Sequence, residues 1–114
     1  MKNIRVAAVQ LEHAPGDKQA NLDKIVDFVE QAAHHDVEIV TFPECCITGY
    51  WFLRHLSREE LTDLAEPVFD GPSSQALLSM AKEYRMTIGA GLVEMGEDHR
   101  LRPCAISKAS RTTR

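Results

Sequence analysis

Glu44 is the side chain whose position in this sequence best suits chemistry. It follows the apolar, β-branched run 39–42 and Pro43, a pattern that predicts a strand with a carboxylate just beyond its carboxyl end. In parallel α/β sheets, ligands bind outside the carboxyl ends of the strands. A carboxylate at that place is positioned to act as an acid or a base. A solvated acid that merely ends a strand would give the same local pattern.

Three aromatic residues, Tyr50, Trp51 and Phe52, follow Glu44 at a short distance along the chain. Their rings favour two interpretations that are compatible with each other. They can close the edge of the sheet as an apolar plug, or they can form the wall of an apolar pocket beside the carboxylate. The spacing of the three residues does not distinguish between the plug and the pocket wall.

The elements that would position Glu44 follow the order strand, helix, strand. Residues 4–11 and 37–42 are compact apolar runs of strand length. Between them, Asp17 can cap a helix whose apolar residues recur at the spacing of a helix lying on a sheet. These residues are Leu22, Ile25, Val26, Val29, Ala32 and Ala33. A strand–helix–strand unit of these lengths is typical of two parallel strands.

The following segment predicts two more helices and a third strand. Ser57 and Glu60 form a capping box that opens a short helix, which Pro67 would close. A turn at 70–74 then opens a longer helix with the apolar stripe Leu77, Leu78, Ala81 and Tyr84, and the run 86–93 is the third strand. The expected order is β-α-β-(short α)-α-β, which indicates an α/β layered architecture.

Composition restricts the class of protein. The chain has 114 residues, of which 44% are hydrophobic and 26% are charged, as is typical of one soluble globular domain. A formal net charge of -4 argues against a nucleic-acid partner. No apolar run reaches the ~18 residues of a membrane span, and the first residues lack the apolar core of a signal peptide. We therefore expect a cytoplasmic protein with no nucleic-acid and no membrane partner.

Cysteines and histidines predict neither a disulfide framework nor a metal site. The chain has 3 cysteines, an odd number, and Cys45 and Cys46 are adjacent, which fits a reducing compartment. Adjacent ligands are poorly spaced to chelate one metal ion, and the same holds for His34 and His35. His55 has no serine or cysteine partner in a matching motif, so we interpret it as a surface histidine. We expect no metal and no cofactor.

The glycines of the third strand give a weak nucleotide-binding signal. Gly89 and Gly91 resemble the start of a dinucleotide fingerprint, but a third glycine and a following helix start are missing. They favour close packing of backbone against the sheet instead. A flavodoxin-like nucleotide-binding domain would need a phosphate loop after the first strand, and residues 12–17 are poorly suited to that role.

The charge composition of the sequence changes after Asp98, from mixed acidic and basic to basic only. The segment 99–114 has no acid, and its basic residues are Arg100, Arg102, Lys108, Arg111 and Arg114. Its apolar residues are too few and too irregular to predict a strand. We therefore expect 98–114 to be a disordered, solvated basic tail, in preference to a segment that binds phosphates or acidic partners.

Taken together, these features resemble the N-terminal portion of the nitrilase superfamily, the carbon–nitrogen hydrolases. The resemblance spans roughly residues 4–97 and is carried, in chain order, by the run 6–10, Asn21, residues 40–50, 70–72 and 88–94. It implies the layered α-β-β-α sandwich of that family, present here as an incomplete N-terminal β-α-β-α-β part. The implied domain boundaries are 1–97 for the hydrolase part and 98–114 for the tail.

Members of that family hydrolyse small amides, nitriles or carbamoyl groups without a metal, by means of a Glu-Lys-Cys triad. The resemblance implies that Glu44 is the catalytic general base and that Tyr50, in its T-G-Y sequence, lines the substrate site. The role of base is best served by a buried carboxylate that can take the proton of a thiol. The implied partner is a small-molecule amide or nitrile.

The other two members of the triad have no match in this chain. Lys108 lacks the sequence context of the family's lysine, and Cys45, Cys46 and Cys104 lack that of the nucleophile. We therefore expect the chain by itself to be inactive, since loss of the nucleophile removes most of the rate enhancement in such enzymes. Because the family pattern stops near His99, we hypothesise a frameshift, a damaged gene or a truncation.

A non-catalytic role is the alternative. Part of a sheet leaves strand edges and apolar faces uncovered, and another chain can cover them. The chain would then be a truncated fragment, or an oligomerisation or binding module. Homo-oligomerisation is one way to cover such surfaces.

Overall fold

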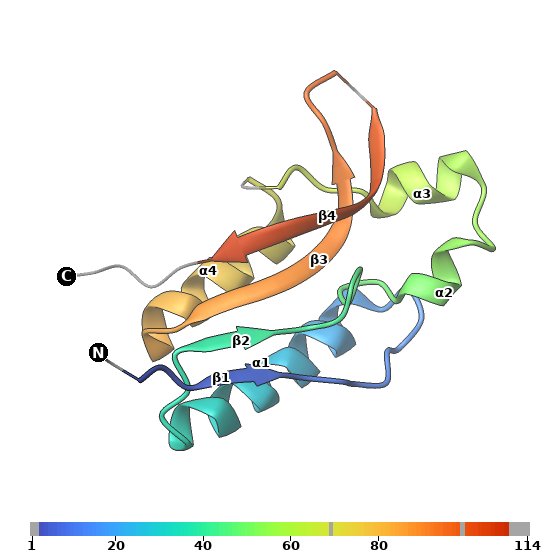
Figure 1. The fold of residues 1–114 in the computed structure, drawn as a ribbon. Coiled ribbons are helices and arrows are strands. Elements are labelled where there is room, and N and C mark those ends of the chain that lie inside the picture. Colours follow the sequence, from blue (N-terminus) through green and yellow to red (C-terminus); the bar gives the residue numbers. More distant parts are fainter. Residues whose placement is uncertain (1–2, 69, 99, 110–114) are drawn as a thin grey trace.

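In the computed structural model, which describes residues 3–68, 70–98 and 100–109 (102–109 as backbone only), the chain forms an open sheet covered by helices. The sheet has four strands in the order β1-β2-β3-β4, and Figure 1 shows them side by side. Their bounds are β1 Val6–Ala8, β2 Ile39–Thr41, β3 Thr87–Met95 and β4 Leu101–Ala109. The strands β1, β2 and β3 are parallel, as the strand–helix–strand pattern predicts for β1 and β2, and β4 is antiparallel to β3.

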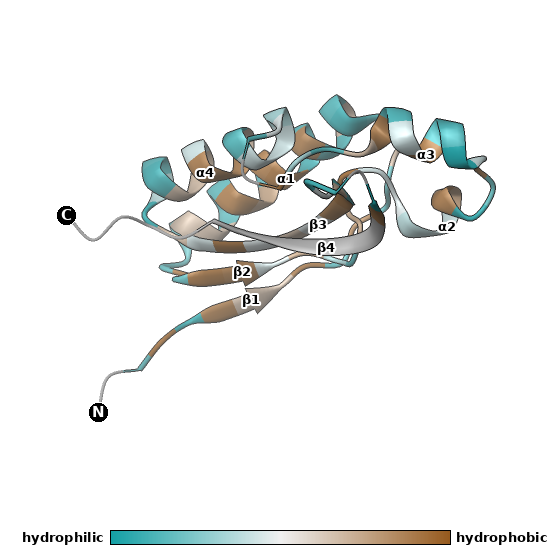
Figure 2. Ribbon diagram, turned by 90° about the horizontal axis from the view of Figure 1, so that it is seen from above, coloured by the Kyte–Doolittle hydropathy of each residue, from teal (hydrophilic) through white to brown (hydrophobic). Residues whose placement is uncertain are grey.

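Both long helices lie on one face of the sheet, as Figure 2 shows. They are α1 (Lys18–His34), between β1 and β2, and α4 (Pro72–Tyr84), before β3. The connection between β2 and α4 contains two short helices, α2 (Tyr50–Leu53) and α3 (Arg58–Leu64). The predicted α/β order is confirmed up to β3. The helix α2 was not predicted, because its four residues are too few to show helical periodicity.

The predicted starts of α1 and α3 are confirmed by their caps. The Asp17 side chain accepts a hydrogen bond of 3.0 Å from the backbone N–H of Ala20 and opens α1. Ser57 and Glu60 form the reciprocal capping box of α3, with distances of 2.9 and 3.1 Å. Such caps satisfy backbone donors that the first helical turn leaves without partners.

The core lies between the sheet and the two long helices. The predicted stripe of α1 faces it, with Ile25 and Val29 fully buried, and Leu77 of α4 is buried opposite them. Val40 of β2 and Ile88 of β3, which are paired in register, close the core from the side of the sheet. The apolar periodicity of the sequence therefore identifies the buried faces correctly.

Glu66 is a buried carboxylate that links α1 to α4. It is 4% exposed, and Nζ of Lys18, in the first turn of α1, lies 2.7 Å from its Oε2. Ser73, near the start of α4, donates its backbone N–H to Oε1 at 2.8 Å and its hydroxyl to Oε2 at 2.7 Å. Burial favours a raised pKa for Glu66, but the hydrogen bonds from Lys18 and Ser73 outweigh it and lower the pKa. The carboxylate is therefore held in its ionised form.

The expectation of a disordered tail is wrong for residues 101–109, which form β4. The register passes from Leu92 opposite Ala105 to Glu94 opposite Arg102, so Pro103 lies in a β-bulge. A bulge accommodates a proline that a regular strand would not. Because pairing with β3 supplies the backbone hydrogen bonds of β4, no local apolar pattern is needed to form the strand. Residues 110–114 lie outside the described part of the chain.

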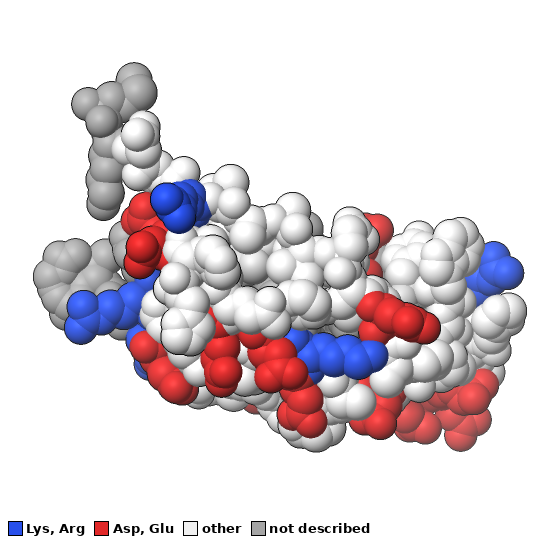
Figure 3. Space-filling view, turned by 90° about the horizontal axis from the view of Figure 1, so that it is seen from below, with Lys and Arg blue, Asp and Glu red and all other residues white. Residues whose placement is uncertain are grey.

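The other face of the sheet carries no helix among the described residues. Val6 of β1 is 67% exposed and Ile4, just before it, is 56% exposed. Figure 3, which views the molecule from the side of β1 and α1, shows an uncharged band next to the acidic side chains that gather along the helical side. An exposed apolar strand of this kind can pack against further polypeptide.

Candidate active site

Glu44 lies in a tight turn directly after β2. Cys45 adopts a positive φ of 52°, and its carbonyl oxygen accepts hydrogen bonds from the N–H groups of Thr48 and Gly49 at 3.2 and 2.8 Å. The turn buries residues 45–49 but leaves Glu44 exposed. The expectation of a buried base is therefore not met within this chain, because the reversal at Cys45 directs the following side chains inward and Glu44 outward.

Gly91 of β3 allows this turn to approach the sheet. A Cβ atom at Gly91 would lie 2.5 Å from the backbone nitrogen of Cys45 and 3.4 Å from the carbonyl carbon of Glu44. The first distance is too short for any side chain, so the position requires glycine. The predicted role of the two glycines in close packing is confirmed at Gly91. At Gly89 a Cβ atom would make an ordinary contact of 3.4 Å with Thr41.

Asn21 connects the Glu44 turn to the segment that follows β1. Its side chain is fully buried and donates hydrogen bonds to the carbonyl oxygens of Ile47 (2.8 Å) and Ala14 (2.9 Å). Its amide oxygen accepts a hydrogen bond of 2.8 Å from the N–H of Ala14. One buried amide on α1 therefore holds both loops that follow the parallel strands β1 and β2. The sequence shows Asn21 at the start of a helix, but not these contacts.

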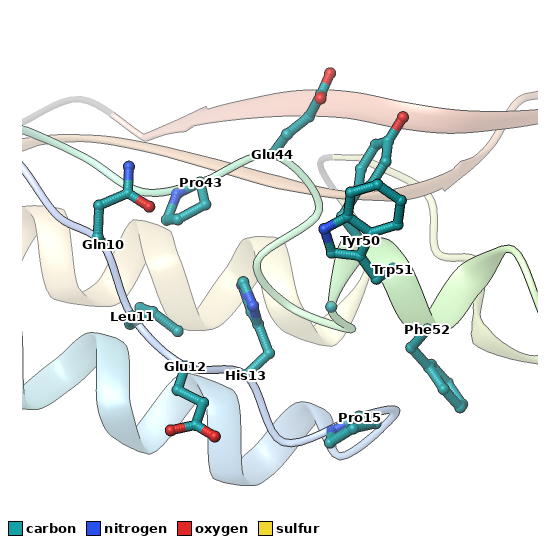
Figure 4. Close-up of a pocket in the computed structure, with 11 residues that line it drawn as sticks. Gln10, Leu11, Glu12, His13, Pro15, Pro43, Glu44, Tyr50, Trp51 and Phe52 are labelled. Carbon is teal, nitrogen blue, oxygen red and sulfur yellow. The ribbon is translucent and has the colours of Figure 1, made fainter.

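These two loops enclose a pocket of about 490 Å³. It is lined by residues 10–13, 15, 43–44 and 49–52, so one wall follows β1 and the other contains α2. Figure 4 shows the side chains of Glu44 and Tyr50 pointing in the same direction. The structure thus brings together Glu44 and Tyr50, the two site residues expected from the sequence. A carboxylate beside an apolar cleft at the carboxyl ends of parallel strands is a common arrangement of ligand sites.

The aromatic residues of α2 form part of the pocket and are also exposed to solvent. Tyr50 is 47% exposed and Trp51 is 70% exposed. Their rings are in edge-to-face contact, with centroids 5.9 Å apart and planes at 84°. The guanidinium carbon of Arg54 lies 5.0 Å from the centroid of the Trp51 ring. Of the two interpretations of this aromatic group, the structure favours the pocket wall for Tyr50 and Trp51.

His13 is a pocket residue that was not predicted from the sequence. Its Nε2 atom is buried without a hydrogen-bond partner among the described residues. Burial lowers the pKa of His13, and the nearby charge of Lys24 lowers it further. The signal that could have found it is its position in the loop after the first strand, because the carboxyl ends of β1 and β2 meet at the same edge of the sheet.

The cysteines next to Glu44 are unsuited to nucleophilic attack. Cys45 and Cys46 are both fully buried, and the Sγ atom of Cys46 lies 3.8 Å from the carbonyl oxygen of Gly91. Burial is the main influence on the thiol of Cys46 and raises its pKa to about 11, so the thiolate is scarce at neutral pH. Neither thiol therefore has the exposure that nucleophilic attack on a bound ligand requires.

Two kinds of feature are absent from the part of the chain that the structure describes. No three side chains of histidine, cysteine, aspartate or glutamate there come together as metal ligands. No helix in that part has the length and apolar character needed to cross a membrane.

The chain belongs to the carbon–nitrogen hydrolase family, because the sequence model of that family matches residues 5–107. The match extends past residue 97, the predicted end of the resemblance, into β4. An arylacetonitrilase of Aspergillus niger is 40% identical over 99 residues, which cover 82% of this chain and 30% of that protein. An omega-amidase of Saccharomyces cerevisiae is 30% identical over 94 residues, covering 81% of this chain and 31% of the relative.

Solved structures show the same fold. A Saccharomyces cerevisiae member of the nitrilase superfamily superposes with a TM-score of 0.75 at 24% identity, covering 94% of this chain and 40% of that one. The sheet and its helical layer therefore form part of the nitrilase fold. The chain spans about a third of the length of the two relatives, the omega-amidase and the arylacetonitrilase (31% and 30%).

Proposed function

We propose that this chain supplies the general base, Glu44, of a hydrolase that acts on small amides or nitriles. The observation that carries the proposal is the position of Glu44 at the carboxyl end of β2, in a pocket that also contains Tyr50. Membership of the carbon–nitrogen hydrolase family supports the reaction class. The Aspergillus relative is named for arylacetonitriles and the yeast relative for an omega-amide, which supports both substrate types.

In the proposed reaction, the Glu44 carboxylate accepts the proton of a cysteine thiol. We expect another polypeptide segment to supply that thiol, because no cysteine of this chain has the sequence context of the family's nucleophile. The thiolate attacks the carbon of the amide, the C–N bond breaks, and ammonia leaves with a proton. Water then hydrolyses the thioester and frees the acid. Tyr50 lines the site and helps to orient the substrate. A correctly placed base contributes about 10²–10⁴-fold to such a reaction.

The chain by itself is expected to release no ammonia above background. The physical reason is that Cys45 and Cys46 are fully buried and that the pKa of Cys46 is raised to about 11, so neither of the two described thiols next to Glu44 is a competent nucleophile. Ammonia release from a panel of small amides, measured with the purified 114-residue chain, checks this prediction. Turnover that disappears in Glu44→Gln would refute the inactivity but support the role of Glu44.

The role of Glu44 is tested in a chimera in which residues 5–97 replace the matching segment of a family member that has the lysine and the cysteine. We expect Glu44→Gln to lower the rate of ammonia release by at least about 100-fold. The matched control is Glu59→Gln, which neutralises an exposed acid on α3 and should leave the rate unchanged. A chimera that keeps its rate with Glu44→Gln would contradict the assignment.

We also propose that the protein is cytoplasmic, because two buried free thiols fit a reducing compartment.

As a second function, we propose that the chain self-associates through the uncovered face of its sheet. The exposure of Ile4 (56%) and Val6 (67%) supports this proposal. Sedimentation velocity at increasing concentration should show a larger species, and Val6→Lys should remove it because a charge would lie in the contact. A wild-type chain that stays monomeric at every concentration contradicts self-association.

A further inference from the structure

We propose that the pocket beside Glu44 binds small uncharged amides or nitriles through an aryl or branched alkyl group that packs against Trp51, and that it disfavours substrates bearing a carboxylate. This inference rests on the proposed function, since it concerns the substrate of the same site.

The wall formed by α2 offers a large apolar surface to a ligand. Trp51 is 70% exposed and Tyr50 is 47% exposed, and Leu11 and Pro43 add apolar surface from the remaining sides of the pocket. Covering such surface with an apolar group is favourable because the surface is removed from water. The volume of about 490 Å³ accommodates a ring or a branched chain in addition to the C–N group.

The orientation of this surface is largely set before a ligand binds. The ring of Trp51 contacts Tyr50 edge to face at 5.9 Å, and the guanidinium of Arg54 stacks over it at 5.0 Å. Figure 4 shows Trp51 and Tyr50 together on one side of the pocket, across from Gln10 and Leu11. Because these contacts restrict the rings, less conformational freedom is lost on binding than with side chains that make no contact.

The charges of the pocket disfavour an anionic ligand. Glu12 and Glu44 both line it, and no lysine or arginine is among the described residues that do. Burial and the charge of Lys24 lower the pKa of His13, which favours the uncharged form of this ring. Figure 3 shows that acidic side chains predominate over basic ones on the β1 and α1 side of the molecule. Lys24, whose ammonium donates a hydrogen bond to the carbonyl oxygen of Glu12, does not itself line the pocket. A ligand carboxylate inside the pocket would therefore meet the like charge of Glu44 without a cationic residue in the lining.

Arg54 is the residue that could reverse this preference against anionic ligands, because its guanidinium could bind a carboxylate at the rim of the pocket. It does not line the pocket, and its position over Trp51 already engages it in a cation–π contact. A variant that removes this guanidinium therefore belongs in the test.

The test uses Trp51 as its reporter, since the chain has only 1 tryptophan. The fluorescence of the full chain is titrated with phenylacetamide, with phenylacetate, which has the same ring but a negative charge, and with acetamide, which lacks the ring. We expect a saturable change with phenylacetamide. Half-saturation with either of the other two should need at least about tenfold more ligand.

Two variants separate charge from shape. Glu44→Gln should strengthen the binding of phenylacetate relative to phenylacetamide, because one like charge is removed. Arg54→Gln should leave the preference for phenylacetamide in place. The proposal is overturned if phenylacetate binds as tightly as phenylacetamide, if acetamide binds equally well, or if every probe changes the fluorescence linearly without saturation, as collisions with an exposed ring would.

Failure of this proposal can be distinguished from failure of the proposed function, because the titration requires no turnover. A pocket that selects phenylacetamide although Glu44→Gln leaves the chimera active would refute the role of Glu44 but not the ligand class. A chimera that depends on Glu44 while the chain shows no preference among the three probes would refute the ligand class alone.

Discussion

Replacing Asn21 with alanine is expected to lower the free energy of unfolding by about 3–4 kcal/mol. The buried amide makes three hydrogen bonds to the backbone of Ala14 and Ile47, and its removal leaves those groups without partners inside the protein. Each unsatisfied buried group costs about 1–3 kcal/mol. Chemical denaturation followed by far-UV circular dichroism measures the loss.

Two further variants sharpen this prediction. Asn21→Asp keeps the size of the side chain but exchanges its two donors for acceptors, so it should also be strongly destabilising. Gln19→Ala is the matched control on α1, because Gln19 is exposed and makes one hydrogen bond of 2.9 Å to Asp23; it should cost less than about 0.5 kcal/mol. An Asn21→Ala chain as stable as the Gln19→Ala chain would show that the loops do not depend on Asn21.

Replacing Glu66 with glutamine is expected to lower stability at neutral pH by about 2 kcal/mol and to weaken the acid sensitivity of the fold. The substitution removes the charge that Lys18 approaches at 2.7 Å and weakens the acceptor that Ser73 uses at the start of α4. Lys18 is partly exposed, so water can solvate its ammonium group after the change and the loss stays moderate.

The pH dependence follows from the lowered pKa of Glu66 in the folded chain. Its ordinary value is 4.5 and the folded value lies below it, so the carboxylate contributes stability above the unfolded pKa. That contribution is lost as the pH falls through the folded pKa. Unfolding free energies measured from neutral pH to below 4.5 should fall more steeply for wild type than for Glu66→Gln.

Glu59→Gln is the control for this experiment, since Glu59 is an exposed acid of α3. Its pH profile should follow that of wild type. If the unfolding free energy of Glu66→Gln falls with decreasing pH as steeply as that of Glu59→Gln, the link between α1 and α4 contributes nothing to the pH dependence of stability.

Periodicity and capping residues were sufficient to predict most of the fold. The stripe of α1 and the caps at Asp17 and Ser57 depend on neighbours within a few residues, so they can be interpreted locally. The parallel pairing of β1 with β2 follows from the length of the helix between them. Glu44 and Tyr50 were predicted as site residues because motif and position after a strand coincide.

The remaining features depend on contacts between distant segments. β4 forms through its pairing with β3, and its own composition does not predict a strand. The outward direction of Glu44 results from the positive φ of Cys45 and the close approach to Gly91, neither of which a sequence pattern reveals. The hydrogen bonds of Asn21 likewise join segments that are 7 and 26 residues apart along the chain.

The first turn of α1 contains both Lys18, which pairs with Glu66, and Asn21, which holds the loops after β1 and β2. Both walls of the pocket and the start of α4 therefore depend on a single stretch of helix. Segments that share an anchor tend to open as one cooperative unit, whereas segments with separate anchors fluctuate independently. The pocket should accordingly have two states, intact or lost, and its walls should not loosen one at a time.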